Sequence, residues 1–179
     1  MLKGFVRSKF FNLVMIYLGW ILCIQQVVDG HPYRGILAVI CVLAVHFLIA
    51  ATRKSDLKML LTMAALGTAL DSFYIALGII EYVGGYSSWI APLWITALWA
   101  LLSISIGHSL AWLKGHWFIE AAAGAIGAPL TYLAAVNVGA GHFTAPLWIA
   151  LGTIGAAWFL ILPLLFHLST VYAHQGEKS

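Results

Sequence analysis

Six long apolar stretches dominate this sequence of 179 residues and restrict what it can fold into. A helix that crosses a bilayer needs about 20 consecutive, mostly apolar residues. The stretches that meet this requirement cover residues 10–28, 34–51, 57–80, 89–113, 117–137 and 145–168. Only 8% of the residues are charged, whereas a soluble domain carries about 25%. The sequence therefore predicts an all-α, polytopic membrane protein in which residues 1–179 form a single domain, a bundle of six transmembrane helices.

The basic residues gather on one side of this predicted bundle. They are Lys3, Arg7 and Lys9 before the first stretch, Arg53, Lys54 and Lys58 around the second connection, Lys114 in the fourth and Lys178 in the tail. Arg34 is the exception on the other side. Because Lys and Arg are retained on the cytoplasmic side of membrane proteins, both termini are predicted to be cytoplasmic. The net charge of +3 is explained by this orientation signal, and no nucleic-acid partner is expected.

The pentapeptide APLWI occurs at residues 91–95 and again at 145–149. Each copy lies at the start of an apolar stretch, and proline is favoured in the first turn of a helix. Trp94 and Trp148 follow about one turn later, where aromatic residues line the membrane interface. The motif is interpreted as a helix-start signal in two similar environments. A remnant duplication of two-helix units is the alternative.

Asp71 lies deep in the third stretch, in the sequence GTALDSFYIALG. At 1.5 Å per residue it is about 20 Å from the cytoplasmic end of its helix. No lysine or arginine lies in the interior of any stretch, so the carboxyl group must be protonated or be solvated by hydroxyl groups, histidine or water. Tyr132 lies at a comparable depth in the fifth stretch. Ionisable groups inside a membrane are candidates for function, so Asp71 and Tyr132 are candidate catalytic residues; the alternative is a structural, hydrogen-bonding acid.

Histidines and one acidic residue collect near the predicted cytoplasmic ends of the stretches. His46, His108 and His167 lie near the ends of the second, fourth and sixth stretches, and Glu120 lies one turn into the fifth. His108 and Glu120 are candidates for a catalytic acid and base. The three histidines are candidate metal ligands, and His46 with His108 could also be axial ligands of a haem. The alternative is that histidines at helix C-termini only complement the helix dipole and the interface.

Four short motifs together resemble those of a known family. They are Asp71 with Ser72, Pro92 with Trp94, His108 with Ser109, and Pro129 with Tyr132. On these motifs the sequence resembles an uncharacterised family of bacterial inner-membrane proteins, described only as a domain of unknown function. The resemblance covers about residues 10–168 and departs from the family pattern at Ala128, where a glycine is expected. It implies a location in the bacterial inner membrane and a link to lipid modification, but no reaction.

Three classes of function agree with this pattern. The first is an enzyme, or the accessory of an enzyme, that acts on a lipid or another apolar substrate within the bilayer. The second is a transporter of a small solute or of protons that uses Asp71. The third is a structural subunit or one that holds a haem or a metal. The sequence has no histidine-box cluster and no phosphate-binding loop, which argues against a di-iron desaturase and against ATP-driven transport by this chain alone. Candidate partners are membrane lipids, a second copy of the chain, and another membrane protein.

Overall fold

The computed structural model of the chain describes residues 9–50 and 52–177. Most of these residues belong to six α-helices: α2 (Lys9–Val28), α3 (Pro32–Ile49), α4 (Arg53–Ala76), α5 (Leu93–Ile106), α6 (Trp117–Asn137) and α7 (Leu147–Glu177). The short strands β1 (Ile80–Tyr82) and β2 (Gly141–Phe143) precede α5 and α7, and the 3₁₀ helix η1 (Ala111–Leu113) follows α5. The prediction of an all-α bundle is confirmed.

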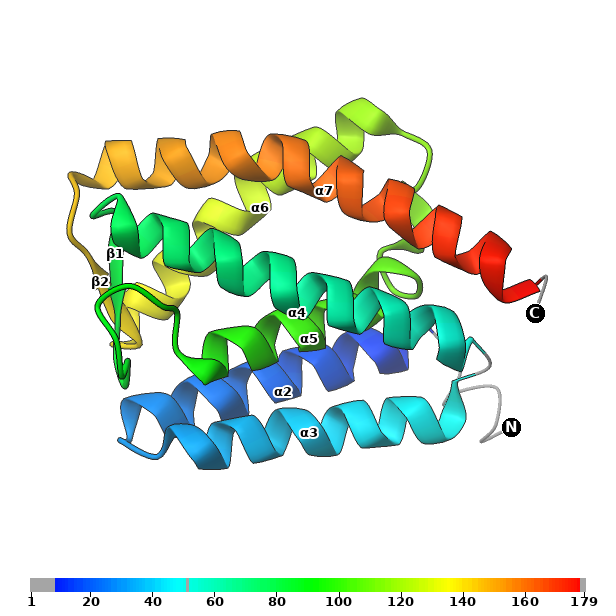
Figure 1. Ribbon diagram of the computed structural model, residues 1–179, viewed down its shortest axis with the longest axis horizontal. Helices are drawn as coiled ribbons and strands as arrows, with labels where there is room; N and C mark the ends of the chain where they lie inside the picture. Colours follow the sequence, from blue (N-terminus) through cyan, green and yellow to red (C-terminus); the bar gives the residue numbers. More distant parts are fainter. Residues whose placement is uncertain (1–8, 51, 178–179) are drawn as a thin grey trace.

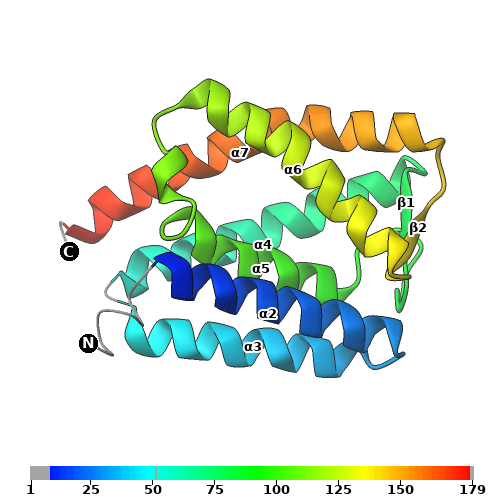
Figure 2. The ribbon, with the colours of Figure 1, turned by 180° about the vertical axis from the view of Figure 1, so that it is seen from behind.

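The helices run back and forth between the two ends of the bundle, which lie at the left and right of Figure 1. The start of α2 and the end of α7 lie at one end, together with the α3–α4 connection and the segment between α5 and α6. Since Arg53, Lys54 and Lys114 lie at these connections, we call this the basic end and the opposite end, which holds β1 and β2, the strand end. α5 packs against α2, α3 and α4, whereas α6 packs mainly on α7 (Figure 2).

Within the described residues, five helices are long and apolar enough to cross a membrane: α2, α3, α4, α6 and α7. By length and composition the chain is therefore a multi-pass membrane protein. The predicted fourth span, residues 89–113, is wrong in its extent, because α5 is helical only from Leu93 to Ile106. α5 is enclosed by three other helices, and most of its residues are buried. Its apolar sequence reflects contact with protein, which hydropathy does not distinguish from contact with lipid.

β1 and β2 form an antiparallel pair at the strand end, which the sequence analysis did not predict. Tyr82 is paired with Gly141 in this register. The predicted third span, residues 57–80, extended too far, because α4 ends at Ala76. Gly78 follows with φ of 64°, the left-handed conformation that commonly terminates helices. The strand pair joins the α4–α5 segment to the α6–α7 segment and carries the side chain of Tyr82 toward the interior of the bundle.

The two copies of APLWI start helices but occupy different environments. Pro92 and Pro146 stand directly before α5 and α7, so the helix-start interpretation is confirmed. Trp148 is 77% exposed, whereas Trp94 is 1% exposed and donates a hydrogen bond from Nε1 to the backbone oxygen of Val83 at 2.9 Å. The expectation that both tryptophans lie at the interface is therefore wrong for Trp94, because α5 is the central helix. Each copy follows a helix and a strand, the repeated order that a duplication of two-helix units would leave.

α6 is held close to α7 by a small residue, and the helix surface beside this contact is open. A Cβ atom added at Gly124 would lie 2.3 Å from the backbone oxygen of Trp158 in α7, a distance that real Cβ atoms do not reach. Glycine at this position therefore permits the two backbones to approach, as small residues do between membrane helices. At Gly127, less than one turn farther on, an added Cβ atom would meet no atom within 4 Å. This face of α6 borders a cavity.

Candidate functional site

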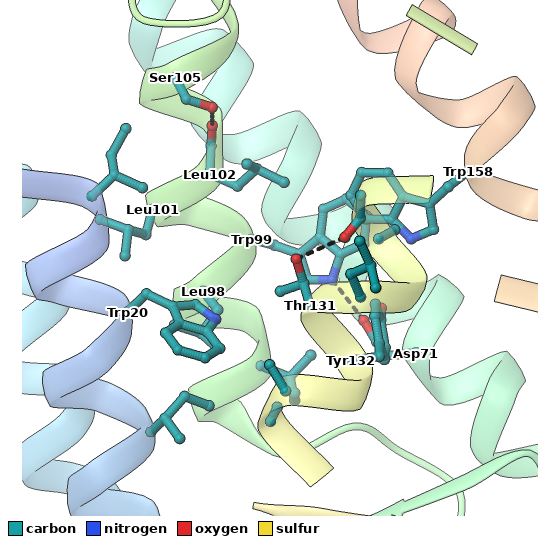
Figure 3. A pocket seen from close by; sticks show the side chains of 18 of the residues that line it. Trp20, Asp71, Leu98, Trp99, Leu101, Leu102, Ser105, Thr131, Tyr132 and Trp158 are labelled. Carbon is teal, nitrogen blue, oxygen red and sulfur yellow. Dashed lines mark hydrogen bonds between the residues drawn. The ribbon is translucent and has the colours of Figure 1, made fainter. Parts of the chain in front are cut away.

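A cavity of about 520 Å³ lies beside α5, between α2 and α6 (Figure 3). The residues of α2 that line it are Leu13, Ile16, Tyr17, Trp20 and Ile24, whose spacing places them on one face of that helix. The lining residues of α6 extend from Ala123 to Val136, which corresponds to about 20 Å of helix. The cavity is thus elongated along the bundle, and its walls are predominantly apolar.

The cavity is open at the side of the bundle. Tyr17 of α2 and Leu130 of α6 both line it, and both side chains are exposed. α2 packs on α3 and α5, and α6 packs on α7, so these two walls of the cavity belong to separate packing units. The opening therefore lies between two of the helices that are long and apolar enough to cross a membrane.

Asp71 is buried in the wall of this cavity, where three side chains donate hydrogen bonds to it. Trp99 Nε1 donates to Oδ2 at 2.6 Å, and the Tyr132 hydroxyl donates to Oδ1 at 2.9 Å. The hydroxyl of Tyr82 also donates to Oδ1. Burial, followed by the nearby Asp71 carboxylate, holds the pKa of Tyr82 well above its usual range, so this hydroxyl stays protonated and remains a donor. Asp71 thereby connects α4 to α5, α6 and β1.

Of the three donors to Asp71, Trp99 is held in place by contacts with two other helices. Its ring stacks on that of Trp158, with centroids 4.9 Å apart and an angle of 16° between the planes. On the other side, the ring lies against Gly67 of α4, where an added Cβ atom would be 1.9 Å from ring carbon Cδ2. Trp99 is thus confined between α4 and α7, which directs its N–H group at the carboxylate (Figure 3). The sequence feature that corresponds to this arrangement is Gly67, which lies one turn before Asp71.

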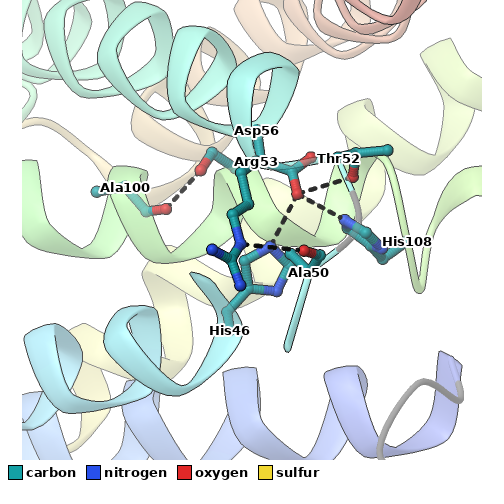
Figure 4. A network of polar contacts seen from close by, with 8 residues as sticks. His46, Ala50, Thr52, Arg53, Asp56, Ala100 and His108 are labelled. Atoms are coloured by element: carbon teal, nitrogen blue, oxygen red, sulfur yellow. Dashed lines mark hydrogen bonds and ion pairs between the residues drawn. The ribbon is translucent and has the colours of Figure 1, made fainter. Parts of the chain in front are cut away.

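A second polar cluster lies at the basic end of the bundle (Figure 4). Asp56 Oδ2 lies 3.1 Å from His46 Nε2 and 3.2 Å from His108 Nε2, and it accepts a hydrogen bond from Thr52 Oγ1 at 2.9 Å. His46 lies in the last turn of α3, Asp56 in the first turn of α4, and His108 in the turn that follows α5. His46 and Asp56 are buried, whereas the His108 side chain is 30% exposed.

The sequence predicts His46 and His108 as candidate metal ligands but does not point to Asp56. Asp56, which contacts both histidines, directly precedes the predicted third stretch. It is therefore expected at the same end of the bundle as both histidines, and this shared position is the sequence feature that could have indicated it. The two imidazole rings are in edge-to-face contact, with centroids 4.9 Å apart. Since nothing fits between rings in contact, the arrangement suits a single ion at their shared edge and does not suit a haem held between them.

The other two candidates lie elsewhere. Glu120 is buried in the first turn of α6, and its carboxylate accepts a hydrogen bond from the backbone N–H of Gly115 at 2.9 Å. It therefore satisfies a backbone donor before the helix, and the expected pairing with His108 is not formed, because His108 contacts Asp56 instead. His167 is exposed on α7 and is not a member of the His46, Asp56 and His108 group. Asp71 and Tyr132, by contrast, are in direct contact.

A comparison with protein families gives a match over most of this chain. The family model described as "Protein of unknown function (DUF2878)" matches residues 9–164. The matched region contains the cavity, Asp71 with its three donors, and the cluster at the basic end. No curated protein and no solved structure matches the chain. The resemblance to an uncharacterised family that the sequence motifs indicated is thereby confirmed.

Proposed function

Since the chain belongs to the DUF2878 family, whose description specifies no activity, we propose that it is a membrane protein that binds the hydrocarbon chain of a lipid in the cavity between α2 and α6. The observation that carries this proposal is the lateral opening of an elongated, apolar cavity between two helices that are long and apolar enough to cross a membrane. Its volume of about 520 Å³ is within the range of small-molecule sites. A bilayer lipid could enter it without leaving the membrane.

The polar groups around the cavity support an amphipathic ligand in a defined orientation. Ser109 lines the cavity toward the basic end, and its Oγ is buried without a hydrogen-bond partner among the described residues. A buried hydroxyl group without a partner is costly, and a rotation of the Ser109 side chain toward the cavity would let the polar head of a ligand satisfy it. Asp71 lies toward the strand end, with its hydrogen bonds already made inside the protein. We therefore place the lipid head near the basic end and its chain along α6.

Within this proposal, a lipid-modifying enzyme or its accessory has more support than a transporter. Both carboxylate oxygens of Asp71 accept hydrogen bonds from fixed aromatic donors. A proton carrier must exchange its proton with water or with a substrate, and such an arrangement hinders that exchange. The location in the bacterial inner membrane, with both termini cytoplasmic, is part of the same proposal and rests on the distribution of Lys and Arg.

Filling the cavity tests lipid binding. In Gly127→Phe the new ring enters the cavity from α6, where the backbone meets no neighbouring atom. We expect about tenfold or greater loss of the lipid that remains bound after detergent exchange, because overpacking of a filled site costs about 1–3 kcal/mol. Native mass spectrometry of the purified full-length chain measures this retained lipid.

Gly152→Phe is the matched control, because Gly152 is also a helical glycine without atoms near an added Cβ and does not line the cavity. We expect this variant to retain lipid like the wild type. Equal retention by wild type and Gly127→Phe, or absence of retained lipid from the wild type, would contradict the proposal.

A further inference from the structure

We propose that His46, Asp56 and His108 form a binding site for a divalent transition-metal ion of the Zn²⁺ class. The potential ligand atoms of the three residues all lie within 4.8 Å of one another. They converge from three separate segments: the end of α3, the start of α4 and the turn after α5. The inference does not depend on lipid binding, because none of the three residues lines the cavity.

The distances from the Asp56 carboxylate to the two imidazoles match a common coordination sphere. Zinc binds imidazole nitrogen and carboxylate oxygen at about 2.1 Å, so two such ligands at a tetrahedral angle lie about 3.4 Å apart. The distances from Asp56 Oδ2 to His46 Nε2 and to His108 Nε2 are 3.1 and 3.2 Å. A small adjustment of the side chains would therefore admit an ion between the three atoms.

The donor set selects the class of metal. Two imidazoles and one carboxylate suit Zn²⁺ and related transition metals, whereas Mg²⁺ and Ca²⁺ prefer oxygen ligands throughout. Thr52 Oγ1 donates to the carboxylate oxygen that faces both histidines, which is the outer support that metal-binding carboxylates commonly have. Because His108 is the most exposed member of the cluster, a fourth coordination position would open on its side, as in zinc sites that bind water or a substrate.

The neighbouring arginine does not neutralise the carboxylate. The guanidinium group of Arg53 is directed at the C-terminus of α3, where it donates to the backbone oxygens of Leu48 and Ala50 at 2.9 and 3.3 Å. The partners of Asp56 Oδ2 are therefore two imidazoles and one hydroxyl group. A bound cation would complete this arrangement, because a buried carboxylate is stabilised by a positive charge in direct contact.

Metal titration of the purified full-length chain tests the site. After treatment with a chelator, the protein is titrated with Zn²⁺ in competition with a chromophoric chelator, and with Co²⁺ as a spectroscopic probe. We expect saturable binding of one ion per chain and visible Co²⁺ bands of a low-coordinate nitrogen and oxygen site. A large excess of Mg²⁺ should not displace the ion. Asp56→Asn, His46→Gln and His108→Gln should each weaken binding by about 100-fold or more, since loss of an outer-shell partner alone costs up to that factor.

His167→Gln is the control, because His167 is an exposed histidine outside the cluster. This variant should bind Zn²⁺ like the wild type, and Zn²⁺ should raise the melting temperature of both by mass action. Thr52→Val keeps all three ligands and should weaken binding by about tenfold, which provides a test if a ligand variant fails to fold. Absence of saturable binding by the wild type, or binding that survives both Asp56→Asn and Thr52→Val unchanged, would overturn the proposal.

Discussion

Replacing Asp71 with leucine is expected to prevent stable folding of the chain. The substitution removes the acceptor of the hydrogen bonds from Tyr82, Trp99 and Tyr132 and leaves these three buried donors unsatisfied. Each buried donor without an acceptor lowers the free energy of unfolding by about 1–3 kcal/mol, so the three together lower it by about 3–9 kcal/mol. This is comparable to the whole stability of a typical domain, about 5–15 kcal/mol. We expect little or no monodisperse protein when Asp71→Leu is purified in detergent and analysed by size-exclusion chromatography.

Asp71→Asn keeps the shape of the side chain and removes only the acceptor of the Trp99 hydrogen bond. It therefore tests that bond separately from those of the two tyrosines. The amide oxygen can accept from Tyr82 and Tyr132, as Oδ1 does, but the amide nitrogen then faces the Trp99 N–H group. We expect a folded protein that is destabilised by about 1–3 kcal/mol, the cost of one stranded donor. Adding Trp99→Phe removes that donor, so the double variant should lose less stability than the sum of the two single variants.

Thermal unfolding monitored by size-exclusion chromatography ranks these variants. The expected order of stability is wild type, then Asp71→Asn, then Asp71→Leu. If Asp71→Leu and the wild type unfold at the same temperature, the hydrogen bonds to Asp71 do not hold the four elements together, and the carboxylate is free for another role.

Gly67→Ala should have the second-largest effect. The added methyl group would overlap the ring of Trp99, at 1.9 Å from Cδ2. The ring cannot move aside without losing its stacking on Trp158 and its hydrogen bond to Asp71. Overpacking of a tight site costs about 1–3 kcal/mol and at times more, and the lost hydrogen bond adds about 1 kcal/mol or more. We expect a clear fall in the temperature at which half of the protein remains monodisperse.

Gly152→Ala is the control for this prediction, because an added Cβ at Gly152 would meet no atom within 4 Å. It should be neutral or slightly stabilising, since alanine is favoured over glycine in a helix by about 1 kcal/mol. Combining Gly67→Ala with Trp99→Ala removes the overlapping ring, so the double variant should be no less stable than Trp99→Ala alone. A double variant that shows the full sum of both losses would contradict the steric explanation.

The apolar stretches determined the class of fold because that information is local. A run of about 20 apolar residues favours a helix wherever it occurs, since every backbone polar group is then satisfied within the segment. The starts of α5 and α7 are equally local, because proline favours the first helical turn whatever surrounds it. The depth of Asp71 without a nearby cation likewise predicted that its carboxyl group is protonated or is solvated by hydroxyl groups, histidine or water, and among these partners the structure provides the hydroxyl groups of Tyr82 and Tyr132.

The tertiary structure alone decided which apolar helix lies inside the bundle and which residues meet. α5 and its neighbouring helices are similarly apolar in composition. Only the packing of the helices therefore shows that α5 is enclosed and that Trp94 is buried while Trp148 is exposed. Asp71 and Tyr132 are 61 positions apart in the sequence, and Asp56 and His108 are 52 apart. Contacts over such separations depend on the relative positions of whole helices, which no local pattern specifies. The sequence by itself therefore determined the helices and their polar residues, and the packing of those helices determined the cavity and both polar clusters.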